Sequence, residues 1–132
     1  MSEPFWLDLD GLIEAHREQI ALFGGSAGIR DIGLIESALA RPKQLYHYEG
    51  EEDVLALAVR LGIGIALNHG FVDGNKRTGA VAMIEFLALN GFDLVMADDG
   101  TFGRWFEAVI EGRMNEAQLA DAIWPFVRAV EG

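Results

Sequence analysis

Two long apolar stretches joined by a short polar link decide the fold. The stretches are EDVLALAVRLGIGIALN (residues 52–68) and NKRTGAVAMIEFLALN (residues 75–90), and the link is HGFVDG (residues 69–74). Each stretch is long enough for a helix and is apolar on nearly every side, which is typical of helices in the centre of a domain. The sequence therefore predicts two buried helices whose ends fix the geometry of the link.

Two further helices are expected before this central pair. The first begins near Asp8 or Asp10 and the second begins after Asp31, because aspartate side chains cap the free amides of a helix start. The second helix is expected to stop before Pro42, since proline disfavours helical conformation in the residue that precedes it. Residues 42–50 are then predicted to form a loop.

The C-terminal third is expected to hold a short extended piece over 92–96 and two amphipathic helices over 101–111 and 115–130. Pro125 is expected to kink or restart the last helix. The chain contains no internal repeat, low-complexity tract or linker that would divide it. We therefore expect an all-α fold with a single domain over residues 1–132.

The composition excludes several classes of function. The chain has 10 Lys and Arg against 21 Asp and Glu, and its net charge of −11 repels the DNA backbone, since nonspecific binding to DNA depends on Lys and Arg that displace counterions. It contains no cysteine and no apolar run of the ~20 residues that a membrane span needs. Its N-terminus does not resemble a signal peptide. We therefore expect a cytoplasmic protein that binds neither DNA nor a membrane.

Cations follow the link at a position where helices normally prefer acids. Lys76 and Arg77 fall in the first turn of the second central helix, where the helix dipole is already positive. A phosphate on the free amides of Gly74 to Arg77 would convert this repulsion into attraction. The sequence therefore predicts a phosphate site formed by Gly74, Asn75, Lys76 and Arg77.

Two further residues of the link complete a candidate active site. Asp73 would repel bound phosphates unless a hard cation such as Mg²⁺ lay between them, so it is the predicted metal ligand. His69, with an ordinary pKa of ~6.5, is the candidate general base for an attacking hydroxyl. Taken singly, Asp-Gly-Asn is a common turn and a histidine often caps a helix end. The combination of these residues within nine positions favours function.

The segment from His69 to Ala80 resembles the Fic family motif, HxFx(D/E)GNxRxxR. Likeness to the Doc (death-on-curing) branch of that family extends through GIRD (28–31) and SALARP (37–42) to Asn90-Gly91. The resemblance implies a Fic-type helical bundle with the motif loop between two central helices. It also implies catalytic roles for His69, Asp73, Lys76 and Arg77, with Asp73 binding the metal and residues 74–77 cradling the phosphates.

Departures from the motif imply the Doc type of reaction. Lys76 replaces the glycine of AMP-transferring Fic enzymes, and Ala80 replaces their final arginine. The likeness then implies a toxin that uses Mg²⁺ and ATP to phosphorylate a Ser or Thr hydroxyl of a translation elongation factor, and that is neutralised by a small antitoxin protein. Gly70, where the family often has proline or an aliphatic residue, predicts a looser link.

Two alternatives remain open from the sequence. One is Fic-type adenylyl transfer, in which AMP rather than the terminal phosphoryl group reaches the protein hydroxyl. The other is a catalytically idle module that only binds a partner through exposed apolar surface. Nucleotide turnover distinguishes them, because an idle module shows none.

Overall fold

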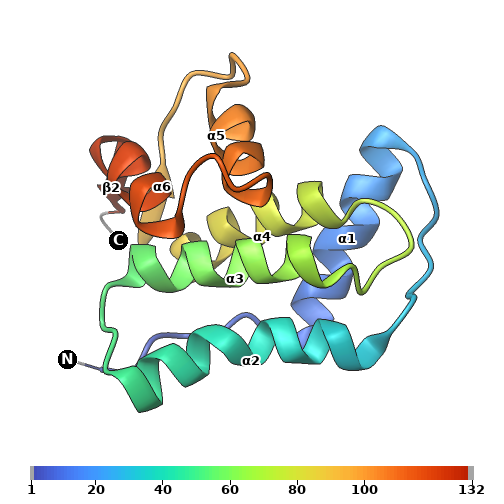
Figure 1. Cartoon of the computed structure of the whole chain (residues 1–132), viewed down its shortest axis with the longest axis horizontal. Coiled ribbons are helices and arrows are strands. Elements are labelled where there is room, and N and C mark those ends of the chain that lie inside the picture. Colours follow the sequence, from blue (N-terminus) through green and yellow to red (C-terminus); the bar gives the residue numbers. More distant parts are fainter. Residues whose placement is uncertain (1, 131–132) are drawn as a thin grey trace.

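The computed structural model describes residues 2–130 and is mostly helical (Figure 1). Its α-helices within that range are α1 (Leu9–Phe23), α2 (Ile32–Glu49), α3 (Val54–Asn68), α4 (Asn75–Leu89), α5 (Thr101–Ile110) and α6 (Glu116–Ile123). A short 3₁₀ turn (Trp124–Phe126) and the strands β1 (Phe92–Leu94) and β2 (Val127–Ala129) complete the described chain. The prediction of an all-α fold is confirmed, with one small sheet added.

α3 is the central helix, and ten of its fifteen residues are buried. α2 packs on one side of it, and α4, α5 and α6 pack on its other sides (Figure 1). The helix begins at Val54 because the carboxylate of Asp53 accepts a hydrogen bond from the amide of Leu55 at 3.0 Å. Among residues 2–130, no helix is both long and apolar enough to cross a lipid bilayer.

The backbones of α3 and α4 approach closely at two glycines. A methyl group added at Gly79 would lie 2.4 Å from the carbonyl oxygen of Gly62, and one added at Gly62 would lie 2.6 Å from that of Gly79. Side chains do not fit at such distances, so the crossing requires glycine on both helices. This contact sets the end of α3 relative to the start of α4, and thereby the span of the link between them.

Aspartates cap the first two helices as predicted. The carboxylate of Asp8 accepts the amide hydrogen of Gly11 at 2.8 Å, and that of Asp31 accepts the amide hydrogen of Gly33 at 2.9 Å. Each bond satisfies an amide that has no partner within its own helix. α1 then runs to Phe23 and ends at Gly24, which has a φ of 84°.

Pro42 lies inside α2, so the prediction of a loop over 42–50 is wrong. The helix continues to Glu49 and ends at Gly50, whose φ of 72° is left-handed. Proline removes one intrahelical hydrogen bond, but Pro42 itself is buried and both Leu45 and Tyr46 pack against the core. Burial of these side chains stabilises helical backbone that the local sequence disfavours.

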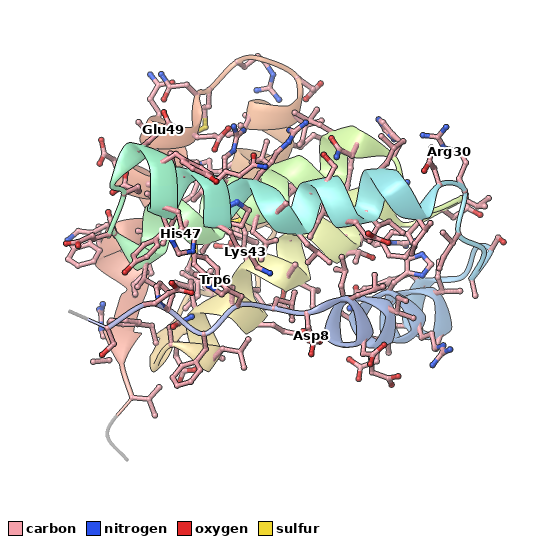
Figure 2. All side chains as sticks on the ribbon, turned by 90° about the horizontal axis from the view of Figure 1, so that it is seen from below. Trp6, Asp8, Arg30, Lys43, His47 and Glu49 are labelled. Atoms are coloured by element: carbon pink, nitrogen blue, oxygen red, sulfur yellow. The ribbon has the colours of Figure 1, made fainter. Side chains whose placement is uncertain are left out.

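The segment before α1 runs along α2 and is held there by Trp6 (Figure 2). The Trp6 ring lies with its centroid 5.8 Å from those of both Tyr46 and Phe86. Its Nε1 donates to the carboxylate of Glu3 at 2.8 Å, and the other Glu3 oxygen lies 3.3 Å from His47 Nε2. These contacts hold the segment before α1 against the C-terminal end of α2, which lies away from the link.

The prediction of a helix over 115–130 is wrong beyond residue 123. α6 ends at Ile123, a 3₁₀ turn containing Pro125 follows, and β2 then pairs antiparallel with β1, with Phe92 opposite Ala129. Proline cannot donate a backbone hydrogen bond, which ends the helix, and β1 offers free backbone groups that β2 satisfies. The extended piece expected over 92–96 is confirmed over Phe92–Leu94, which form β1.

Replacing Gly79 by alanine is predicted to destabilise the protein by about 1–3 kcal/mol, because the new methyl group overlaps the α3 backbone. The matched control is Gly103→Ala on α5, where an added methyl group meets nothing within 4 Å. The control should leave stability unchanged or raise it by up to about 1 kcal/mol. Urea denaturation followed by circular dichroism measures both, and equal stabilities would contradict the glycine crossing.

The half-buried carboxylate of Glu85 on α4 predicts a pH-dependent stability. Burial, and then repulsion from Glu18, raise its pKa above the ordinary value of 4.5. The folded state therefore disfavours the charged form, a cost that is absent below about pH 4.5 and complete above the folded-state pKa. Glu85→Gln should thus raise the thermal midpoint at pH 7 and lose this advantage as the pH falls to 4.5. Glu36→Gln, which removes an exposed carboxylate of α2, controls for net charge.

Candidate active site

The link begins with a histidine in an unusual backbone conformation. His69 follows the last residue of α3 with φ 52° and ψ 43°, and within residues 2–130 it is the only non-glycine residue with positive φ. Arg30 Nε donates to the carbonyl oxygen of His69 at 2.7 Å, which places a cation at the negative end of the helix dipole. The backbone of His69 is thus fixed while its side chain stays exposed.

The segment between α1 and α2 lies against the link and pairs with it. The amides of Arg30 and Asp31 both donate to the carbonyl oxygen of Gly70, at 2.8 and 3.0 Å, and the amide of Val72 donates to that of Gly28 at 2.9 Å. In Figure 1 both segments lie at the same end of the molecule. Backbone pairing over this short stretch holds the link from outside the two helices that it joins.

Gly70 tightens the link, contrary to the prediction that it loosens it. The residue is buried, and a methyl group added there would lie 2.4 Å from Cγ1 of Ile35 and 3.1 Å from the Ile35 amide nitrogen. The start of α2 therefore packs directly on the backbone of Gly70. A larger residue at this position would push α2 away from the link.

Asn75 closes the link with its side chain. Its Oδ1 accepts the amide hydrogen of Phe71 at 3.0 Å, and its Nδ2 donates to the carbonyl oxygen of Phe71 at 2.9 Å. The Phe71 side chain is buried beneath the link. Both polar ends of the Asn75 side-chain amide are thereby engaged, and its backbone amide has no side-chain cap.

The start of α4 carries free amides and two cations. Gly74 precedes the helix with a left-handed φ of 76°, and no side chain caps this end. Lys76 Nζ lies 3.3 Å from Glu107 Oε1 of α5, with both side chains half-exposed. Arg77 lies over the ring of Phe23, 5.0 Å from its centroid. Exposed ion pairs contribute ~1 kcal/mol or less, so an arriving phosphate can compete for these cations.

Asp73 is anchored by one carboxylate oxygen. Its Oδ2 accepts the amide hydrogen of Ser26 at 2.7 Å, while a methyl group added at Gly25 would lie 3.1 Å from Asp73 Cβ. The segment after α1 thus fixes the side chain by close contact. The carboxylate is exposed and keeps acceptor capacity for a further ligand.

One open pocket of about 410 Å³ brings the predicted residues together. Its lining consists of His69, Val72, Asp73, Gly74, Asn75, Lys76 and Arg77. The volume lies in the range of pockets that bind small molecules and cofactors. A protein of net charge −11 therefore holds a pocket lined by two cations, a histidine and a single carboxylate. The roles assigned to these residues stay predictions.

His16 is a residue of this site that the sequence interpretation did not single out. Its buried ring stacks on that of Phe71 and so contacts the link from the protein interior. Its Nε2 lies 2.8 Å from the carbonyl oxygen of Asp73. A histidine among apolar positions was the available signal, but its partner lies 57 residues away and is set by the tertiary fold.

The sequence matches one family model and is similar to two toxin and kinase proteins. The Fic/DOC family model matches residues 6–87. The toxin Doc of Mycolicibacterium smegmatis is 39% identical over 84 residues, which cover 58% of this chain and 65% of that toxin, just under two thirds of its length. The protein kinase doc of Escherichia phage P1 is 30% identical over 115 residues, which cover 85% of this chain and 87% of that protein.

The family model and the similarity to the phage protein point to the same family. The family model spans α1 to α3 and most of α4, including the link and the segment between α1 and α2 that pairs with it. The similarity to the phage protein covers most of both chains. The chain therefore belongs to the Fic/DOC family.

Proposed function

We propose that this chain is a Doc-like toxin that transfers the terminal phosphoryl group of ATP to a Ser or Thr hydroxyl of a protein, a translation elongation factor. The observation that carries the proposal is the arrangement around one pocket of a histidine, a carboxylate and a helix start bearing two cations. The names of the relatives, a toxin and a protein kinase, agree with this class of activity.

The start of α4 is the proposed phosphate site. The amides of Asn75, Lys76 and Arg77 have no side-chain cap, and the positive end of the helix dipole coincides with them. Lys76 and Arg77 add charge-assisted hydrogen bonds to phosphate oxygens. The contacts that these cations make with Glu107 and Phe23 are replaced, at little cost, when phosphate arrives.

Asp73 fits the role of Mg²⁺ ligand. Within residues 2–130, no group of three or more His, Asp or Glu side chains could hold a metal ion by itself. Mg²⁺ commonly binds one or two carboxylates together with substrate phosphates, which matches a lone, exposed carboxylate beside a phosphate site. When bound, Mg²⁺ would neutralise charge on the phosphates. Asp73 would hold it through the acceptor capacity that the Ser26 amide leaves free.

His69 is the proposed general base. Its imidazole accepts the proton of the Ser or Thr hydroxyl as the hydroxyl oxygen bonds to the γ-phosphorus and the bond from that phosphorus to the bridging oxygen breaks. ADP leaves with its charge held at the start of α4. Arg30 fixes the backbone of His69, so the base can act without rearrangement of the end of α3.

The distribution of cations favours transfer of the terminal phosphoryl group over transfer of AMP. Lys76 supplies charge at the mouth of the site, whereas Ala80, one turn further along α4, supplies none for phosphates bound more deeply. The best position for the outermost phosphate is therefore near His69. A small antitoxin that covers the protein in the cytoplasm is part of the same proposal, in keeping with a relative named as a toxin.

Reactions with ATP labelled at either the α or the γ position are predicted to transfer label to a protein in a bacterial lysate only from the γ position. Each reaction is run with Mg²⁺ and again with excess EDTA, which should abolish the transfer. Label arriving only from the α position would establish AMP transfer instead. Label from neither position in the presence of Mg²⁺ would favour a module that only binds a partner.

Removal of the His69 imidazole is predicted to lower the transfer rate by ~10²- to 10⁴-fold while leaving nucleotide affinity and the thermal midpoint nearly unchanged. His69→Asn is the better variant, since asparagine tolerates the left-handed conformation found there, and His69→Ala is its companion. His47→Asn, at the end of α2 away from the link, is the control and should keep the full rate (Figure 2). A rate above half that of the wild type would remove His69 from the mechanism.

A further inference from the structure

A buried histidine of α1 supports the link from the protein interior. His16 is only 1% exposed, and its ring stacks on that of Phe71 with centroids 3.8 Å apart and planes within 9° of parallel. Phe71 belongs to the link and is itself buried. The flat contact between the two rings joins α1 to the centre of the link.

The same ring also makes a polar contact with the link. His16 Nε2 lies 2.8 Å from the carbonyl oxygen of Asp73, and because a carbonyl oxygen only accepts, Nε2 carries the hydrogen. An unpaired polar nitrogen in the core would cost free energy, so the bond also specifies where the ring sits. His16 therefore holds Phe71 by stacking and Asp73 by a hydrogen bond.

Asp73 is consequently held at two places by different parts of the chain. Its main-chain carbonyl bonds to His16 of α1, and its carboxylate bonds to the amide of Ser26 in the following segment, at 2.7 Å. The next residue, Gly74, is also close: a methyl group added there would lie 3.8 Å from His16 Cδ2 and 3.2 Å from Ile20 Cδ1. The end of the link therefore rests on α1 directly before α4 begins.

We propose that His16 is a positioning residue of the active site. Through the Asp73 carbonyl and the Phe71 ring, it sets where the Asp73 carboxylate and the first amides of α4 lie relative to His69. His16 does not line the pocket. Its effect on transfer rests on the function proposed above, whereas its effect on the geometry of the link does not.

Histidine combines a flat ring with an N–H donor, whereas phenylalanine and glutamine each retain only one of these two properties. Phenylalanine keeps a flat ring for stacking on Phe71 but leaves the Asp73 carbonyl without its donor. Glutamine keeps an N–H donor of comparable reach but loses the ring. The pair His16→Phe and His16→Gln therefore separates the hydrogen bond from the stacking contact.

The test measures the link and the reaction in the same proteins. Amide hydrogen exchange over residues 70–78 reports the link, and kcat, the KM for ATP and the Mg²⁺ midpoint report the site. In His16→Phe, exchange should become faster, the Mg²⁺ midpoint should rise and kcat should fall by about 10- to 100-fold, since small displacements of catalytic groups have effects of that size. His16→Gln should recover part of the lost kcat.

The control is His47→Phe, which replaces an exposed histidine at the far end of α2 and should match the wild type in every readout except the thermal midpoint. A His16→Phe protein with wild-type exchange, Mg²⁺ midpoint and kcat would overturn the proposal, as would one in which only the thermal midpoint falls. Equal kcat values for the phenylalanine and glutamine variants would overturn the role of the hydrogen bond. If the wild type transfers no label, the proposed function fails, and hydrogen exchange still decides whether His16 positions the link.

Discussion

The contact between Gly62 and Gly79 is the constraint on which the rest of the structure depends. The α3 and α4 backbones meet there so closely that a methyl group on either glycine would lie within 2.6 Å of the opposite carbonyl oxygen. Since both helices pack into the core, fixing their crossing fixes the distance that residues 69–74 must span. Every residue that lines the pocket lies on that link or on the first turn of α4, so the crossing determines where the lining can lie.

Two supports outside the central pair then remove the remaining freedom of the link. The backbone of residues 28–31 pairs with it on one side, and His16 of α1 contacts it from the core. Such supports matter because a catalytic group displaced by about 1 Å can lose most of its effect. The site is thus held by α1, by the segment after it and by the central helices together, although the residues that line its pocket all come from one short stretch of sequence.

The pocket is lined by more cations than carboxylates, whereas the protein as a whole is negatively charged. A net charge of −11 surrounds a helix start that carries Lys76 and Arg77 and no acidic cap. In the structure, Glu107 of α5 lies beside Lys76, and the ring of Phe23 faces Arg77. These half-exposed contacts hold the cations near the pocket but stabilise them weakly. A phosphate group is the kind of ligand that would satisfy both cations and the free amides at once.

The sequence by itself determined the helical fold, the central pair, the caps at Asp8 and Asp31 and the set of residues around the pocket. Each of these depends on apolar periodicity or on residues close together in the chain, which local sequence specifies. The continuation of α2 through Pro42, the pairing of Val127–Ala129 with Phe92–Leu94 and the contact of His16 with Asp73 were decided only by the tertiary structure. In these three cases, burial or a partner far away in the sequence outweighs the local preference, because the free energy gained by packing and by paired backbone groups exceeds that of helix propensity.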